Sequence, residues 1–140
     1  MKILLAVDDS PSTQRMLDHL LSHREWLVEG NQFEVVHGLS PLPHGLSALL
    51  DDAEVAQRLQ ADARAVLEPV RRQLEAHGIA ALYTHEVGAS SSVVARLAGQ
   101  GGFDLVIIGS HGHGALAQWL SGSTVSGVLA RSTVPLLVIR

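Results

Sequence analysis

The sequence predicts a Rossmann-like α/β fold in which helices cover both faces of a doubly wound, five-stranded parallel sheet. Short runs rich in Ile, Leu and Val alternate along the 140 residues with longer segments whose apolar residues have helical spacing. No linker, repeat or low-complexity segment interrupts this alternation. One domain over residues 1–140 is therefore expected, because alternating strands and helices form a parallel sheet with right-handed crossovers.

The N-terminal part of the chain predicts a strand, a helix and a second strand. The apolar run Lys2–Val7 is typical of a strand that is buried on both faces. Ser10 and Pro11 provide an N-cap and a first helical residue. Apolar residues with helical spacing then follow, namely Met16, Leu17, Leu20 and Leu21. Phe33–His37 is the second predicted strand, and the Gly and Pro content of residues 38–47 predicts a loop.

The next segment, Leu49–His77, keeps a helical period and ends before Gly78, a favoured residue after a helix C-terminus. Pro69 inside this segment is expected to kink or split the helix. Ser90 is expected to cap one shorter helix, and Ser123 to open another. Three more strands are predicted, at Ala80–Val87, Asp104–Gly109 and Val134–Arg140.

Composition excludes several classes of function. With 4% aromatic residues, a net charge of −4 and a pI near 6.0, the chain lacks the stacking platform and basic surface of a nucleic-acid-binding protein. It has no cysteine, which excludes disulfides and thiolate metal sites. The N-terminus predicts a strand instead of a signal peptide, and no segment is apolar enough to span a membrane. We therefore expect a cytoplasmic protein.

The segment from Val106 to Ser132 contains several glycines and no Asp, Glu, Lys or Arg before Arg131. Gly109 ends a predicted strand, Gly112 follows three residues later, and Gly122 precedes a predicted helix. Glycines at such a junction let backbone N–H groups approach an anion, and a helix N-terminus adds positive charge. This pattern indicates a phosphate site. The alternative is that these are ordinary turn glycines in a surface loop.

The motifs of common nucleotide sites are absent. A P-loop requires lysine after its second glycine, whereas position 115 is alanine and Lys2 is the only lysine in the chain. The turn after the first strand, "VDDSPS", lacks the glycines of a Rossmann dinucleotide site. Fast nucleoside triphosphate hydrolysis is therefore not expected, and no catalytic residue is assigned.

The spacing G-x2-G-x9-G-S/T over residues 109–123 resembles the nucleotide-binding signature of the universal stress protein family. The resemblance extends over the chain, through "ILLAVDDS", "VVH", "FDLVIIGSHG" and "VPLLVIR". It implies the strand order 3-2-1-4-5 and ATP as the ligand, bound between strands 1 and 4. It also implies a homodimer formed by the last strand, Val134 to Ile139.

The resemblance implies contacts with adenine, ribose and phosphates along this crevice. Asp8 and the backbone of Ala6 and Val7 would contact adenine and ribose. The rest of the implied site comprises Gly38, Ile108, Gly109, Gly112, His113, Gly122, Ser123 and Thr124. Asp9, Gly38 and His113 depart from the usual family residues, so we expect weaker binding, or binding that depends on Mg²⁺ or Mn²⁺.

Other functions are weighed against this one. The opening of the chain also resembles a receiver domain, but that domain needs a lysine after its last strand, and the chain has none there. His111 and His113 are too few to form a zinc site. Ser110 and His111 lack the G-x-S-x-G elbow of a hydrolase. A module of the same fold that binds no nucleotide is the main alternative.

Overall fold

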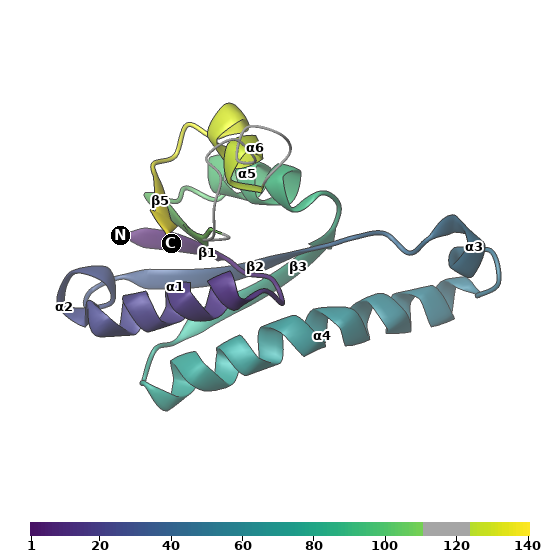
Figure 1. The fold of residues 1–140 in the computed structure, drawn as a ribbon, viewed down its shortest axis with the longest axis horizontal. Helices are drawn as coiled ribbons and strands as arrows, with labels where there is room; N and C mark the ends of the chain where they lie inside the picture. The colour runs from purple at the N-terminus through teal and green to yellow at the C-terminus, as the bar shows by residue number, and fades with distance from the viewer. Residues whose placement is uncertain (111–123) are drawn as a thin grey trace.

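The computed structural model describes residues 1–110 and 124–140. Within them, five parallel strands form one sheet in the order β3-β2-β1-β4-β5, which confirms the predicted doubly wound architecture (Figure 1). The strands are β1 (Lys2–Ala6), β2 (Gln32–Leu39), β3 (Ala81–Val87), β4 (Leu105–Gly109) and β5 (Leu136–Ile139). The described helices are α1 (Pro11–Ser22), α2 (Arg24–Leu27), α3 (His44–Ser47), α4 (Asp52–Ala76), α5 (Ser90–Gln100) and α6 (Thr124–Arg131).

The central strand β1 is buried on both faces, as its unbroken apolar sequence predicts. Ile3, Leu4 and Leu5 have no exposed surface. Ile3 is paired with Phe33 of β2 on one side and with Leu105 of β4 on the other. Removing each of these side chains from water stabilises the fold by roughly 1.5–3 kcal/mol.

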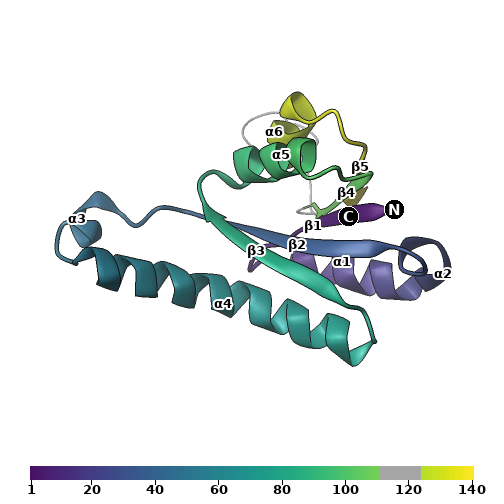
Figure 2. The ribbon, with the colours of Figure 1, turned by 180° about the vertical axis from the view of Figure 1, so that it is seen from behind.

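Helices lie on both faces of the sheet, so the molecule has two hydrophobic cores (Figure 2). One core lies under α1, α2 and α4 and includes Leu5, Met16 and Leu74. The other lies under α5 and α6 and includes Leu4, Val94 and Val128. Adjacent residues of β1 thus serve opposite cores, which is the period-2 alternation of a strand.

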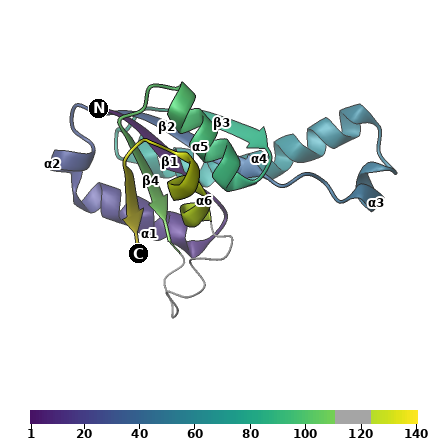
Figure 3. The ribbon, with the colours of Figure 1, turned by 90° about the horizontal axis from the view of Figure 1, so that it is seen from above.

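The segment after β2 differs from the predicted loop. β2 continues through Gly38 and Leu39, since both residues are paired with β3, opposite Glu86 and Val87. A short helix, α3, then forms within the rest of that segment. The first half of α4 extends together with α3 beyond the sheet, as Figure 3 shows from above. The Gly and Pro residues therefore predicted the start of the loop at residue 38, whereas β2 ends at Leu39.

Helix α4 is a single helix of 25 residues despite Pro69, so the expected split does not occur. Its start is fixed by a capping box, in which the Asp51 side chain accepts from the Glu54 N–H at 2.8 Å and Glu54 accepts from the Asp51 N–H at 2.9 Å. The end is as predicted, with Gly78 at φ +72°. Helix α5 differs from prediction, because Ala89 is its N-cap and Ser90 is already helical.

Candidate functional site

A crevice lies at the carboxyl ends of β1 and β4, where the strand order reverses direction. All of the predicted site residues that the structure describes line it: Ala6, Val7, Asp8, Gly38, Ile108, Gly109 and Thr124. The other predicted residues, Gly112, His113, Gly122 and Ser123, lie outside the described residues. In open α/β sheets this reversal point is the usual position of a ligand, because the helices on the two sides diverge there.

Sheet pairing explains why residues far apart in the sequence meet at this crevice. Ala6, the last residue of β1, is paired with Val36 on one side and with Ile108 on the other. These three side chains belong to the core under α5 and α6, or lie at its edge. The floor of the crevice is therefore apolar and formed by three adjacent strands, while its walls come from the start of α5 and from α6.

Asp8 is held in place by a network at the start of α1. Its Oδ1 accepts from the Ser10 N–H at 3.0 Å, from Ser10 Oγ at 2.6 Å and from Thr13 Oγ1 at 2.9 Å. Thr13 Oγ1 in turn accepts from the Asp8 N–H at 2.9 Å. The carboxylate is thus fixed at the edge of the crevice and close to the N-terminus of α1.

Two glycines of the crevice allow a helix to approach the sheet. A Cβ on Gly38 would lie 2.7 Å from the Cα of Ser90, the first residue of α5. A Cβ on Gly109 would overlap the backbone carbonyl of Ser12 in α1. Real Cβ atoms do not approach backbone so closely, so both glycines have a packing role. That role is independent of any ligand.

Sequence reasoning missed several residues that line the crevice, namely Thr13, Val36, Ser90, Val94 and Val125. Val36 and Val94 carry no chemical signal, since apolar residues in a strand or helix have the same appearance in a core. Thr13 could have been found from its position five residues after Asp8. Ser90 enters the crevice only because Gly38 lets α5 approach, a tertiary contact that no local pattern contains.

The first residue beyond β4 contacts a cation from α1. Arg15 donates to the carbonyl oxygen of Ser110 at 3.2 Å, while the buried hydroxyl of Ser110 has no hydrogen-bond partner among the residues that the structure describes. The only lysine is at the opposite end of β1, where Lys2 donates to the Gly101 carbonyl at 2.8 Å and lies over the Phe103 ring. Of these two cations, only Arg15 lies near the crevice.

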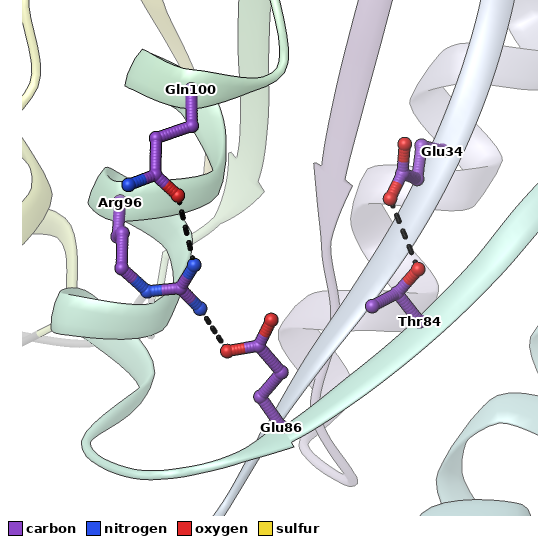
Figure 4. A network of polar contacts seen from close by, with 5 residues as sticks. All are labelled: Glu34, Thr84, Glu86, Arg96 and Gln100. Carbon is purple, nitrogen blue, oxygen red and sulfur yellow. Dashed lines mark hydrogen bonds and ion pairs between the residues drawn. The ribbon is translucent and has the colours of Figure 1, made fainter.

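Polar contacts outside the crevice hold α5 against the edge of the sheet. Arg96 donates to both Glu86 of β3 and Gln100, and Thr84 donates to Glu34 across β3 and β2 at 3.0 Å (Figure 4). The contact between Arg96 and Glu86 joins the middle of α5 to the end of β3. Because Ser90 begins the same helix, this ion pair helps to set the wall of the crevice.

Residues 1–110 and 124–140 contain neither a metal-binding cluster nor a membrane-spanning helix. No three His, Asp or Glu side chains in this part of the chain are grouped so that they could hold a metal ion. No helix within these ranges is both long and apolar enough to cross a membrane. The predicted histidine pair, His111 and His113, lies outside the described residues.

The sheet order and the crevice at its reversal point define a doubly wound α/β protein of the 3-2-1-4-5 type. The model of the universal stress protein family matches residues 1–140, and the chain belongs to this family. The strand order also excludes a receiver domain, because receiver domains have the order 2-1-3-4-5.

Known relatives agree with this membership. The chain is 26% identical over 125 residues to universal stress protein MJ0577 of Methanocaldococcus jannaschii, a match that covers 89% of this chain and 75% of that protein. The solved structure of MJ0577 has a TM-score of 0.76 at 25% identity, covering 99% and 94% of the two chains.

Two more distant structures share the fold and contain adenine nucleotides. A universal stress protein of Arabidopsis thaliana was solved with AMP bound, with a TM-score of 0.69, 14% identity and coverage of 99% and 90%. Another universal stress protein was solved in complex with cAMP, with a TM-score of 0.73, 20% identity and coverage of 100% and 96%. At these identities the likeness to this chain is one of fold.

Proposed function

We propose that this protein is a nucleotide-dependent regulatory module of the stress response that binds ATP, with Mg²⁺ or Mn²⁺, in the crevice between β1 and β4. The observation that carries the proposal is the meeting of every described member of the sequence-predicted site in one crevice at the reversal point of the sheet. The AMP and cAMP bound by two relatives of the same fold support an adenine nucleotide as the ligand class.

The chemistry of the crevice fits the two parts of such a ligand. Ala6, Ile108 and Val125 offer an apolar surface to a base, and the fixed Asp8 carboxylate can accept hydrogen bonds from ribose hydroxyls. Carboxylates repel phosphates, so the triphosphate would extend away from Asp8 toward β4 and the start of α6. Glycines there would expose backbone N–H donors, and Arg15 would add a positive charge near Ser110.

A fast enzyme is not part of the proposal. The single lysine is hydrogen-bonded at the far end of β1, so it cannot act on β- and γ-phosphates as the lysine of a P-loop does. The phosphates would instead link the end of β4 to the start of α6. Because α6 leads directly into β5, an edge strand, nucleotide occupancy would change a surface that is available to partners.

Isothermal titration calorimetry tests the proposal by titrating the protein with ATP and Mg²⁺, with GTP as a control for recognition of the base. Gly112→Val adds a side chain to a glycine of the predicted phosphate site, and Gly45→Val is the matched control. A Cβ on Gly45 meets no atom within 4 Å, and Gly45 lies in α3, away from the crevice. We expect Gly112→Val to weaken ATP binding by about tenfold or more, which is the loss of one charge-assisted hydrogen bond or more.

Competition by AMP and cAMP then defines how much of the affinity comes from the phosphates. ATP binding that AMP displaces, and that GTP does not reproduce, would support an adenine site. ATP binding to the wild type that calorimetry cannot detect would contradict the proposal. It would favour the alternative, a module of the same fold whose glycines serve only the packing of α1 and α5.

A further inference from the structure

A second hollow lies on the opposite face of the sheet, between the long helix α4 and the edge strand β3. This α4–β3 groove has a volume of about 570 Å³. Its apolar floor includes Ala63 and Leu67 of α4, and its polar lining includes Arg64, Arg71, Tyr83 and His85. The nucleotide crevice shares no lining residue with it. The groove is therefore a separate candidate site, and it does not depend on the proposed function.

Tyr83 supplies an unsatisfied donor to the groove. Its hydroxyl is buried and has no hydrogen-bond partner within residues 1–110 and 124–140, although most buried hydroxyls in proteins are paired. The Arg71 guanidinium lies 4.1 Å from the centroid of the Tyr83 ring. Burial raises the pKa of the Tyr83 hydroxyl, a shift that Arg71 partly opposes and that Glu75 and Glu68 reinforce. At neutral pH this hydroxyl is therefore protonated and can donate to an acceptor.

The charged groups that line the groove are unevenly paired. Glu68 lies 3.8 Å from Arg71 and 3.1 Å from Arg72, so its negative charge is already balanced. Within the described part of the chain, Arg64 and His85 have no hydrogen bond or ion pair. Since Arg64 and Arg71 both line the groove against the one carboxylate of Glu68, the lining has a net positive charge. The whole chain, in contrast, has a net charge of −4.

We propose that the α4–β3 groove binds a small monocarboxylate with a compact apolar or aromatic body. A carboxylate accepts two parallel hydrogen bonds from one guanidinium, which matches Arg64, the arginine of the groove lining that has no partner among the described residues. Its apolar body would lie over the α4 floor beside Leu67, and an oxygen would accept from the Tyr83 hydroxyl once the side chains that now cover that hydroxyl move aside. A phosphate dianion fits less well, because it needs more positive charge than one unpaired guanidinium in the lining provides.

Tyr83 is the only tyrosine in the chain, so it reports on its own groove. With tyrosine labelled at Cζ with ¹³C, the protein gives one tyrosine resonance, whose shift follows the hydrogen bonding of the hydroxyl. Benzoate is the probe, and benzamide is its neutral control of nearly the same shape. We expect benzoate to shift this resonance saturably and benzamide to leave it in place.

Arg64→Gln removes the unpaired guanidinium, and Arg58→Gln is the matched control. Arg58 lies on the same helix, is exposed, and faces Asp62 at 3.8 Å outside the groove lining. Arg64→Gln is expected to weaken benzoate binding by about tenfold, the loss of one charge-assisted interaction. Arg58→Gln should bind benzoate as the wild type does. Saturation with ATP should leave the benzoate affinity unchanged, because the two sites lie on opposite faces of the sheet.

Three outcomes would overturn the proposal. The first is a benzoate titration without a saturable shift, and the second is equal shifts with benzoate and benzamide. The third is saturable binding of inorganic phosphate that Arg64→Gln abolishes, which would assign the groove to phosphate instead of carboxylates. ATP binding is measured separately by calorimetry, so failure here leaves the nucleotide proposal untouched.

Discussion

At the scale of single residues, Asp8 combines a structural and a proposed binding role. Its Oδ1 accepts three hydrogen bonds at the start of α1, and the same side chain lines the crevice. The resemblance to the universal stress protein family predicted Asp8, through the segment "ILLAVDDS". It could not predict the hydrogen bonds with Ser10 and Thr13, which require the turn into α1 to be known.

Replacing Asp8 in two ways separates these roles. Asp8→Asn keeps an Oδ1 acceptor for the turn but removes the charge, whereas Asp8→Ala removes both. We expect Asp8→Ala to lower the free energy of unfolding by about 1–2 kcal/mol, as loss of an N-terminal helix network does, and Asp8→Asn to lower it much less. Urea denaturation measures this difference.

Both Asp8 variants should bind ATP about tenfold more weakly if the carboxylate accepts from ribose. Calorimetry on the folded Asp8→Asn variant makes this comparison without a loss of stability. Wild-type ATP affinity in Asp8→Asn would show that Asp8 serves only the turn.

Tyr83 leads to a prediction about stability and pH. Tyr83→Phe removes a buried hydroxyl without a partner, so it should raise the free energy of unfolding by about 1 kcal/mol at neutral pH. Burial raises the pKa of this hydroxyl in the folded state. Above about pH 10 the unfolded chain therefore binds fewer protons than the native protein, and stability falls as pH rises.

The Tyr83→Phe variant lacks that titration. Its stability should fall less than that of the wild type between neutral pH and pH values above about 10, measured by urea denaturation at each pH. Parallel pH profiles for the two proteins would contradict a buried hydroxyl at position 83.

At the scale of elements, the sequence predicted what depends on local pattern and missed what depends on tertiary contact. Periodicity predicted α4, and its end at Gly78 agrees with a positive φ. The same reasoning expected Pro69 to kink or split the helix, but α4 is one helix through Pro69, and its neighbours Leu67 and Val70 are buried in the core. Gly38 was placed in a loop because glycine is common there. Pairing with Glu86 instead keeps it in β2, where Ser90 approaches it.

The contact of α5 with β2 can be tested through Gly38. Gly38→Ala places a methyl group 2.7 Å from the Cα of Ser90, so α5 must shift at its first turn. We expect a loss of about 1–3 kcal/mol in the free energy of unfolding, typical of an overpacked contact. Gly99→Ala is the control, because Gly99 lies in the same helix and a Cβ there meets no atom within 4 Å.

Gly99→Ala should leave stability unchanged or raise it by about 0.5–1 kcal/mol, since alanine favours helix more than glycine does. Urea denaturation of the two variants gives the comparison. Equal stability of Gly38→Ala and the wild type would mean that α5 does not approach β2 as closely as described.

At the scale of the whole molecule, the two edges of the sheet differ in how they are covered. Edge strand β3 has α4 across one face and is joined to α5 by Arg96 and Glu86. The other edge, β5, is a short apolar strand whose outer side has no strand beside it among the described residues. Open apolar edges associate with other strands unless they are covered. We therefore retain the prediction that β5 forms a homodimer.

The pattern of β5 hydrogen bonds identifies a variant that blocks such pairing without breaking the sheet. The carbonyl oxygens of Pro135 and Ile139 accept from Val106 and Ser110, so these residues face β4. Alternation along the strand turns the backbone of Leu136 and Val138 to the open edge. Val138→Pro removes an outward N–H, a position that tolerates proline in an edge strand.

If β5 forms the dimer, analytical ultracentrifugation should show a dimer for the wild type and a monomer for Val138→Pro. Val138→Thr keeps the N–H and the side-chain shape, so it should remain dimeric and serves as the control. A wild type that sediments as a monomer, or a Val138→Pro variant that stays dimeric, would contradict an interface at β5. If α6 transmits nucleotide occupancy to this edge, ATP with Mg²⁺ should also change the dissociation constant of the wild-type dimer. The Val138→Pro variant should be monomeric with and without ATP.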